Sequence, residues 1–222
     1  MHRSFTANAS LAIPTSPWHL EGDALIIIGR LGRHYARSLA GSVSNLIAPR
    51  LLGSIAAVSF IRYSTTPVGP YHELAVTPGV IWRGIPAAFI SHMLVDDPRS
   101  QRGGRAIWGL PKEMAHFTWG PAVGECAVTD AAGTALISAQ SRLRRRWLGL
   151  PVPPLPFMSV RGPRRQFFTV NGSSGRLYRA HVDLSIPPAS PYAPLAPLTT
   201  GPHLAFWLEG FRLRISSPYD LL

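Results

Sequence analysis

Short apolar runs recur along the chain, several of them alternating with polar residues, and glycine or proline separates them. Residues 23–29 are mostly apolar and include three β-branched isoleucines, which predicts a buried strand, and residues 71–77 alternate as a strand does. The 22 prolines and 20 glycines favour many short strands joined by turns. Further strands are predicted at residues 55–63, 87–95, 115–119, 125–129, 134–143, 165–170, 177–184, 204–208 and 211–215.

The segments between these runs have predictions of their own. Residues 165–170 and 177–184 are expected to form a hairpin about the turn sequence 171–175. The proline-rich residues 150–157 are predicted to be a loop, because proline cannot donate to a sheet ladder. Residues 31–52 have roughly helical spacing that glycine and proline interrupt, so their state is ambiguous. Asp96 or Asp97 is expected to cap a short helical turn before Gly103 and Gly104.

This pattern predicts a mainly β fold, an antiparallel sheet curled into a barrel or cone with an internal pocket and a few short helices. A chain of 222 residues fits a single domain that spans residues 1–222, with residues 1–12 as an irregular arm. Its single cysteine, Cys126, excludes an internal disulfide framework and suits a reducing compartment. The apolar runs are too short to cross a bilayer, and no apolar core follows the N-terminus as in a signal peptide. A cytoplasmic protein without a membrane partner is therefore expected.

The formal net charge of +11 invites a nucleic-acid hypothesis. Its best support is the arginine cluster Arg142, Arg144, Arg145 and Arg146. No recognisable nucleic-acid module surrounds these arginines, so a solvated loop or a subunit contact explains them equally well. We therefore expect no nucleic-acid partner.

Metal and cofactor chemistry receive little support from the sequence. The eight histidines include no pair at metal-ligand spacing, and one cysteine cannot build a thiolate site. The sequence Gly29-Arg30-Leu31-Gly32 lacks the full glycine fingerprint of a dinucleotide site. The prediction is a protein with no metal and no cofactor.

Lys112 is the only lysine among the 22 basic residues; all the others are arginines. A guanidinium stays protonated at physiological pH, whereas a neutral amine can act as a nucleophile. Where only positive charge was needed, this chain has arginine. Lys112 is therefore a candidate for covalent chemistry, although a surface lysine spared by an arginine-rich composition is the alternative.

The residues around Lys112 resemble the active-site signature of the acetoacetate decarboxylase family. Gly104-Arg105 and Pro111-Lys112 keep the frame of that signature, and the resemblance implies that Lys112 forms a Schiff base with a substrate ketone. Glu113 stands where the family has a second lysine. A carboxylate at that position would favour the ammonium form of Lys112, although residues 112 and 113 of a regular strand project to opposite faces.

A second segment, residues 63–74, resembles the family's glycine turn that leads to an acidic residue of the active site. Glu73 is the matching residue, 39 positions before Lys112 (112 minus 73). The family's early arginine, which helps to hold the substrate carboxylate, has no counterpart near residues 21–23, where this chain has acidic residues. Acetoacetate itself is therefore not the expected substrate.

The resemblance implies catalytic roles for Lys112, Glu73 and Glu113. Substrate binding is expected from Arg105, Arg62, Trp108 and Tyr71. It also implies a barrel with a pocket, a small keto or keto-acid substrate and a homo-oligomer.

Three functions remain open on the sequence alone. The first is a Schiff-base lyase that acts on a keto or keto-acid substrate by decarboxylation, aldol chemistry or dehydration. The second is a barrel that cyclises or binds an apolar metabolite without a covalent step. The third is a basic binding module with salt-dependent affinity for nucleic acid.

Overall fold

A computed structural model describes residues 13–36, 38, 50–82, 84–147, 151–161, 164–173 and 175–221. The expected arm at residues 1–12 and most of the ambiguous segment 31–52 lie outside these residues. The strands are β1 (Trp18–Arg30), β2 (Arg50–Thr65), β3 (Tyr71–Trp82), β4 (Ile85–Phe89), β5 (His92–Val95), β6 (Lys112–Met114), β7 (His116–Trp119), β8 (Cys126–Thr129), β9 (Ala135–Trp147), β10 (Pro151–Arg161), β11 (Arg164–Ser173), β12 (Arg176–Ser185), β13 (Leu204–Ile215) and β14 (Tyr219–Leu221). The helices are α2 (Pro98–Trp108), α3 (Pro197–Thr200) and the 3₁₀ turn η1 (Ala193–Leu195).

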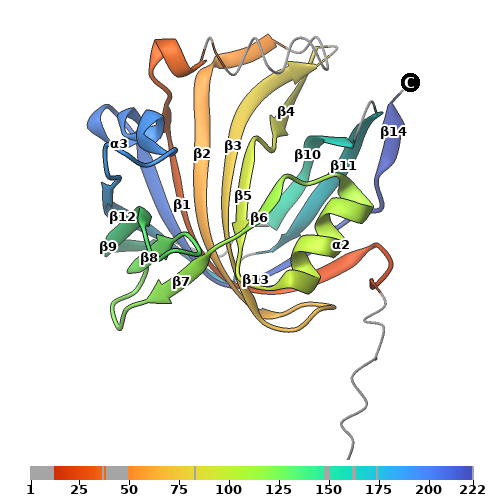
Figure 1. Cartoon of the computed structure of the whole chain (residues 1–222), viewed down its shortest axis with the longest axis horizontal. Coiled ribbons are helices and arrows are strands. Elements are labelled where there is room, and N and C mark those ends of the chain that lie inside the picture. The colour runs from red at the N-terminus through yellow and green to blue at the C-terminus, as the bar shows by residue number, and fades with distance from the viewer. Residues whose placement is uncertain are drawn as a thin grey trace, which may run out of the picture.

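A mainly β fold is confirmed, and its centre is a closed barrel of seven strands. Neighbouring strands follow the order β11-β10-β4-β3-β2-β1-β13, and pairing between β11 and β13 closes the ring. The sheet continues beyond β13 through β12, β9, β8 and β7, which lie on the opposite side of β1–β3 from β10 and β11 (Figure 1).

Strands β1, β2 and β3 are buried on both faces because two layers cover them. On β3, Glu73, Ala75 and Thr77 face the barrel interior, whereas Leu74 and Val76 face outward. The outward side chains pack with residues of β8, β9, β12 and α3 in a second hydrophobic core. Period-two alternation thus builds a cavity wall and a second core from the same strands.

Helix α2 lies at one side of the barrel, below β10 and β11 in the view of Figure 1. Asp97 caps it, since its carboxylate accepts the backbone N–H groups of Arg99 and Ser100, and Gly109 ends it in the left-handed conformation. The helix does not stop before Gly103 and Gly104, as the sequence suggested, but includes both. No helix among the described residues is both long and apolar enough to cross a membrane.

The predicted loop is wrong at residues 151–157, because these residues belong to β10. Its prolines are tolerated for a geometric reason. The register against β11 shifts between Val152 and Leu155, and pairing with β4 is restricted to Phe157 and Met158. Few ladder hydrogen bonds are therefore demanded of the proline positions.

The predicted hairpin of residues 165–170 and 177–184 is also wrong. Strand β11 pairs with residues 212–215 of β13, and β12 pairs with residues 205–209 of the same strand. The consecutive strands β11 and β12 thus pair with different halves of β13 instead of with each other.

The predicted strand 87–95 is divided into β4 and β5. Both pair with β3, but the register shifts by one residue between the pairs Gly79↔Ala88 and Val76↔His92. At the break, the backbone N–H of Ile90 donates to the carbonyl of Met158 at 3.0 Å.

Candidate active site

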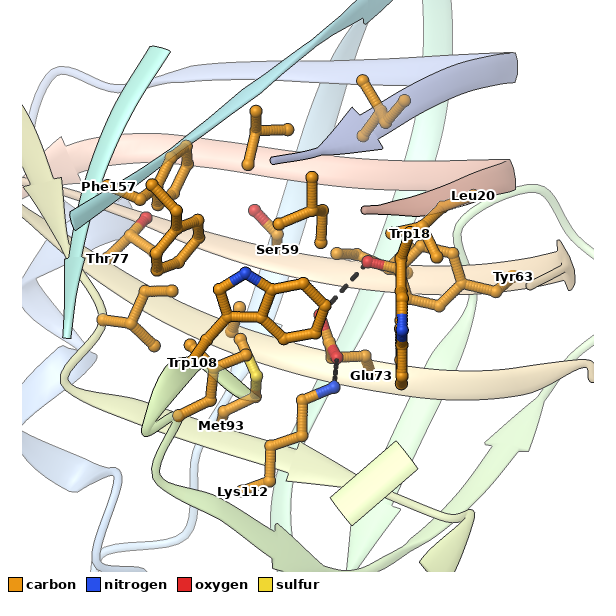
Figure 2. Close-up of a pocket in the computed structure, with 18 of the residues that line it drawn as sticks. Trp18, Leu20, Ser59, Tyr63, Glu73, Thr77, Met93, Trp108, Lys112 and Phe157 are labelled. Atoms are coloured by element: carbon orange, nitrogen blue, oxygen red, sulfur yellow. Dashed lines mark hydrogen bonds and ion pairs between the residues drawn. The ribbon is translucent and has the colours of Figure 1, made fainter. Parts of the chain in front are cut away.

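The barrel encloses a cavity of about 350 Å³ (Figure 2). Most of its wall is apolar, from Trp18, Leu20, Ile26, Ile61, Ala75, Ile90, Met93, Trp108, Leu110, Leu155, Phe157, Phe168, Val170, Leu208, Leu213 and Ile215. The polar lining side chains are those of Ser59, Tyr63, Tyr71, Glu73, Thr77 and Lys112. The cavity wall is therefore largely hydrophobic, and polar side chains form only a small part of it.

Lys112 reaches this cavity from β6, and its side chain is only 3% exposed. Its Nζ donates to Glu73 Oε2 at 2.7 Å and to Ser100 Oγ at 2.9 Å, and it lies 3.5 Å from the Tyr71 hydroxyl. The ammonium group is thus surrounded by oxygen acceptors within the protein. Such satisfaction is needed, because a buried charge without partners is very unfavourable.

Two tyrosines hold the carboxylate of Glu73. The Tyr63 hydroxyl donates to Oε1 at 3.2 Å, and the Tyr71 hydroxyl donates to Oε2 at 3.4 Å. Burial, and next the negative charge of Glu73, raise the pKa of Tyr63 and of Tyr71 well above the usual value. Both hydroxyls therefore stay protonated at neutral pH and remain donors to the carboxylate.

Helix α2 and strand β5 fix the position of Lys112. The Lys112 carbonyl accepts from Arg105 Nε at 2.7 Å and from Gln101 Nε2 at 3.3 Å, while β6 runs parallel to β5. Gly104 lets the helix approach the lysine closely: a Cβ there would lie 2.7 Å from Lys112 Cδ and Cε. The glycine of the signature thus makes room for the lysine side chain.

The structure brings together four of the residues that the sequence singled out. Lys112, Glu73, Tyr71 and Trp108 all line the cavity, and Trp108 is held by a hydrogen bond from its Nε1 to the Ser216 carbonyl at 2.9 Å. Their roles in catalysis and binding stay predictions.

The other three candidates lie outside the cavity. Arg62 faces outward on β2, between the inward Ile61 and Tyr63, and donates to Asp23 at 2.7 Å. Arg105 is exposed, and its Nε binds the Lys112 backbone instead of facing the cavity. Neither of the two arginines that were expected to bind an anion is therefore among the described residues that line the cavity.

Glu113 is exposed and projects to the face opposite Lys112. Its charge acts on His92, where burial lowers the pKa and Glu113 opposes that shift. The opposite-face geometry expected of a regular strand thus separates Glu113 from the lysine amine.

Sequence reasoning did not assign Ser100 or Tyr63 to the site. Ser100 is fully buried and shares one face of α2 with Gly104 and Trp108, at a spacing of four residues. That spacing was the available signal, but it required a helix that runs through Gly103 and Gly104. Tyr63 follows from the alternation of β2, two residues after the inward Ile61.

Residues 49–152 match the sequence model of the acetoacetate decarboxylase (ADC) family. This segment of 104 residues, just under half of the chain, is similar to the acetoacetate decarboxylase family. The matched segment contains the five polar residues that are hydrogen-bonded around the amine, Tyr63, Tyr71, Glu73, Ser100 and Lys112. The apolar wall that β1, β11 and β13 contribute lies outside the segment.

Solved structures extend the likeness of this acetoacetate decarboxylase-like chain to its whole length. Acetoacetate decarboxylase from Legionella pneumophila subsp. pneumophila str. Philadelphia 1 is 16% identical, with a TM-score of 0.75 over 99% of this chain and 93% of that one. The enduracididine biosynthesis enzyme MppR is 16% identical, with a TM-score of 0.73 over 96% and 90%. An acetoacetate decarboxylase-like enzyme from Sphingomonas wittichii RW1 is 13% identical, with a TM-score of 0.71 over 98% of both chains. At these identities the likeness establishes the fold.

One curated relative is similar to part of the chain. Protein NEOXANTHIN-DEFICIENT 1 from Oryza sativa subsp. japonica is 28% identical over 104 residues. The match covers 46% of this chain and 34% of the rice protein, so it spans about a third of that relative's length.

Proposed function

We propose that this chain is an enzyme of the acetoacetate decarboxylase family in which Lys112 forms a Schiff base with the carbonyl group of a small substrate. The observation that carries the proposal is the buried Lys112 amine, which lines the barrel cavity and lies 2.7 Å from Glu73 Oε2. An amine at the wall of a hydrophobic container is suited to covalent chemistry on a carbonyl compound.

Glu73 provides the proton acceptor that the amine needs. In an apolar site, transfer of one proton from Lys112 Nζ to Glu73 Oε2 removes both charges at once, which burial favours. The Tyr63 and Tyr71 hydroxyls remain bonded to the carboxyl group throughout. The neutral amine then has a free electron pair for attack.

Imine formation follows from these two residues. The amine nitrogen bonds to the carbonyl carbon, and the carbonyl oxygen takes the proton that Glu73 holds. Transfer of a proton from nitrogen to the departing hydroxyl, through Glu73, releases water and leaves a protonated imine. Its positive charge then lies beside the Glu73 carboxylate, where the ammonium group was before.

A relative with the same fold supports carbonyl substrates. Structures of MppR are described as complexes with pyruvate and with the condensation product of pyruvate and imidazole 4-carboxaldehyde. Pyruvate is a keto acid and the aldehyde is a second carbonyl compound. A ketone or an aldehyde is therefore a reasonable substrate class for the present cavity.

The apolar lining favours a second candidate function, a barrel that binds or cyclises an apolar metabolite without a covalent bond. In that case the Lys112–Glu73 pair would serve only to orient a polar group of the ligand. Conversion of the ligand would then survive the replacement of Lys112 by arginine.

Borohydride trapping tests the covalent proposal directly. Because Lys112 is the only lysine, a reduced adduct on any side-chain amine must be on this residue, and peptide mass spectrometry separates it from the α-amino group. We expect acetone and larger ketones to give an adduct at Lys112 in the wild-type protein and none in Lys112→Arg, which keeps the charge but cannot form an imine. A folded wild-type protein that binds ketones but gives no adduct would overturn the proposal.

A further inference from the structure

We propose that the substrate is a neutral, largely apolar ketone or aldehyde of about a dozen non-hydrogen atoms, and that its chemistry is proton removal next to the imine. This inference rests on the proposed Schiff base, and it concerns what else the cavity accepts besides the carbonyl group.

Charge balance inside the cavity is the first argument. Among the described residues that line it, the ionised side chains are those of Lys112 and Glu73, and they neutralise each other at 2.7 Å. Near them, the Tyr63 and Tyr71 hydroxyls donate to Glu73, and the Ser100 hydroxyl is engaged with Lys112 and Tyr71. A substrate carboxylate would enter a hydrophobic space that already holds a matched pair, and would stay without a counter-ion.

Lys112 cannot serve as that counter-ion and as the nucleophile together. An ammonium group that pairs with a substrate carboxylate has no electron pair for attack on the carbonyl carbon. The two arginines expected to bind an anion do not help, since Arg62 pairs with Asp23 on the outer face and Arg105 binds the Lys112 carbonyl. The geometry therefore disfavours keto acids.

The dimensions of the cavity set the size of the ligand. A volume of 350 Å³ corresponds to about a dozen non-hydrogen atoms, when each is given the roughly 30 Å³ that a water molecule occupies in the liquid. Glu73, Ala75 and Thr77 follow one another along the cavity wall on β3, and the four steps from Glu73 to Thr77 span about 13 Å. Phe157 and Thr77 lie on the far side of Trp108 from Glu73 in the view of Figure 2.

Apolar side chains cover the wall beyond Lys112 and Glu73. Trp18, Trp108, Phe157 and Phe168 provide aromatic surfaces, and aliphatic residues of β1, β5, β11 and β13 provide most of the remainder. Such a wall binds a hydrocarbon tail and gives no compensation to a charged one. Figure 2 shows Lys112 and Glu73 together at one part of this container.

A substrate without a carboxylate cannot lose carbon dioxide, so the imine must act differently. The C–H bond beside the protonated imine breaks, its proton goes to Glu73, and its electron pair forms the C=C bond of an enamine. The electrons of the C=N bond return to the nitrogen of Lys112, which becomes neutral. This step is shared by aldol reactions and by dehydration of hydroxyketones, and it needs no further co-reactant.

A set of matched ligands tests the proposal with the full chain. The probes are 2-nonanone, 2-oxononanoate, and 2-nonanol, which has no carbonyl group and reports binding without an imine. We expect the ketone and the alcohol to bind at least tenfold more tightly than the keto acid, and only the ketone to be trapped efficiently at Lys112. In D₂O, the wild-type protein should exchange the hydrogens next to the ketone, whereas Lys112→Arg and Glu73→Gln should not.

Each contrary result has a separate meaning. Tight binding and trapping of 2-oxononanoate, equal to those of 2-nonanone, would overturn the neutral-substrate inference and leave the Schiff base intact. Binding of 2-nonanol with no trapping of 2-nonanone would instead overturn the Schiff-base proposal. If none of the three ligands binds, both are wrong.

A variant that narrows the cavity, compared with a matched control, separates the effect of cavity size on binding from an effect on folding. Ala75→Val narrows the cavity midway between Glu73 and Thr77, while Ala56→Val adds the same atoms to the second core, away from the cavity. We expect Ala75→Val to weaken 2-nonanone binding at least fivefold more than it weakens acetone binding, whereas Ala56→Val leaves the ratio of the two affinities unchanged. Equal effects of the two variants on 2-nonanone would overturn the placement of the tail.

Discussion

The Lys112–Glu73 ion pair is a buried pair with nearly every polar atom satisfied. Its Nζ and carboxylate oxygens contact Ser100, Tyr63 and Tyr71 as well as each other. Burial of two charges is unfavourable by itself, and the attraction between them offsets that penalty only while both are present. The contribution of Lys112 to the free energy of unfolding therefore depends on the presence of Glu73, and the contribution of Glu73 depends on Lys112.

A double-mutant cycle measures this dependence. Lys112→Met and Glu73→Gln should each lower the free energy of unfolding by about 3–5 kcal/mol, because each leaves one buried group without its partner. The double variant should recover most of that loss, since no charge remains. Chemical denaturation provides the measurement, and simple additivity of the two losses would contradict the prediction.

The exposed pair of Arg176 and Glu209 is the control for that cycle. It has a similar length, 3.1 Å, but both side chains are largely in solvent. Glu209→Gln should change stability by less than about 1 kcal/mol, as for other surface ion pairs.

The two tyrosines that bind Glu73 predict a loss of stability at alkaline pH. Their pKa values are raised in the folded state by burial and next by Glu73, so above about pH 10 the unfolded chain releases protons that the folded chain keeps. Stability should therefore be constant below pH 10 and fall above it. Tyr63→Phe should make this fall shallower by about 1.4 kcal/mol per pH unit.

Denaturant unfolding between pH 8 and pH 12 checks the tyrosine prediction. Tyr219→Phe is the comparison, because Tyr219 is 52% exposed and only burial raises its pKa. It should alter the slope much less than Tyr63→Phe. Identical slopes for both variants would be inconsistent with the buried tyrosine cluster.

At the scale of single elements, α2 is the segment that positions the reactive amine. Its buried face contains Ser100, Gly103, Gly104 and Trp108, which contact or adjoin the cavity wall. The glycines are unfavourable for a helix interior, so their presence is explained by close approach rather than by propensity. A Cβ at Gly103 would lie 2.7 Å from Trp18.

Gly104→Ala should reduce imine formation more than it reduces stability. Alanine raises helix propensity by about 1 kcal/mol, and the atoms in its way belong to the Lys112 side chain, which can turn aside. We expect the rate of acetone trapping to fall at least tenfold, with a change in unfolding free energy of less than about 1 kcal/mol.

Gly103→Ala makes the same change of propensity one residue earlier, but it meets the rigid Trp18 ring instead of Lys112. This variant should lose more stability and retain trapping by the protein that remains folded. Equal trapping rates for Gly104→Ala and the wild type would rule out the proposed contact with the lysine.

The sequence predicted the elements better than it predicted their partners. The resemblance pointed to Glu73, and the alternation of β3 turns Glu73 into the cavity, while its neighbour His72 pairs with Asp96 on the other face at 2.6 Å. The proline run of β10 and the division between β4 and β5 were missed, because ladder bonds to neighbouring strands decide them. Arg62 and Arg105 were misplaced for a similar reason: a charge suggests an anion, but strand and helix geometry turned both away.

At the scale of the whole molecule, β13 joins the two layers. Its residues 205–209 pair with β12, while its residues 212–215 pair with β11 and close the barrel. A single-strand pattern shows that one face is buried but not which neighbour covers it. This explains why the sequence predicted a curled sheet and at the same time an incorrect β11–β12 hairpin.

Gly172→Ala tests the closure between β11 and β13. A Cβ at this position would clash with the backbone oxygen of Arg212, which cannot move without disturbing the pairing. We expect a loss of about 1–3 kcal/mol in stability and faster hydrogen exchange at residues 170–173 and 212–215. Gly201→Ala, which meets nothing within 4 Å, should change neither quantity appreciably.

The pairing of β1 with β13 also has a consequence for the time course of folding. Trp18 pairs with Ile215, so strands from opposite ends of the chain lie side by side in the finished barrel. During synthesis, β1 emerges almost 200 residues before this neighbour (215 minus 18 is 197), and the apolar wall of the cavity stays open until then. A topology dominated by contacts between residues so distant in the sequence folds slowly. Until it has folded, unpaired strand edges and apolar surface are exposed and can associate with other unfolded chains. Refolding yield should therefore fall steeply as protein concentration rises, long before the native protein itself shows any tendency to aggregate.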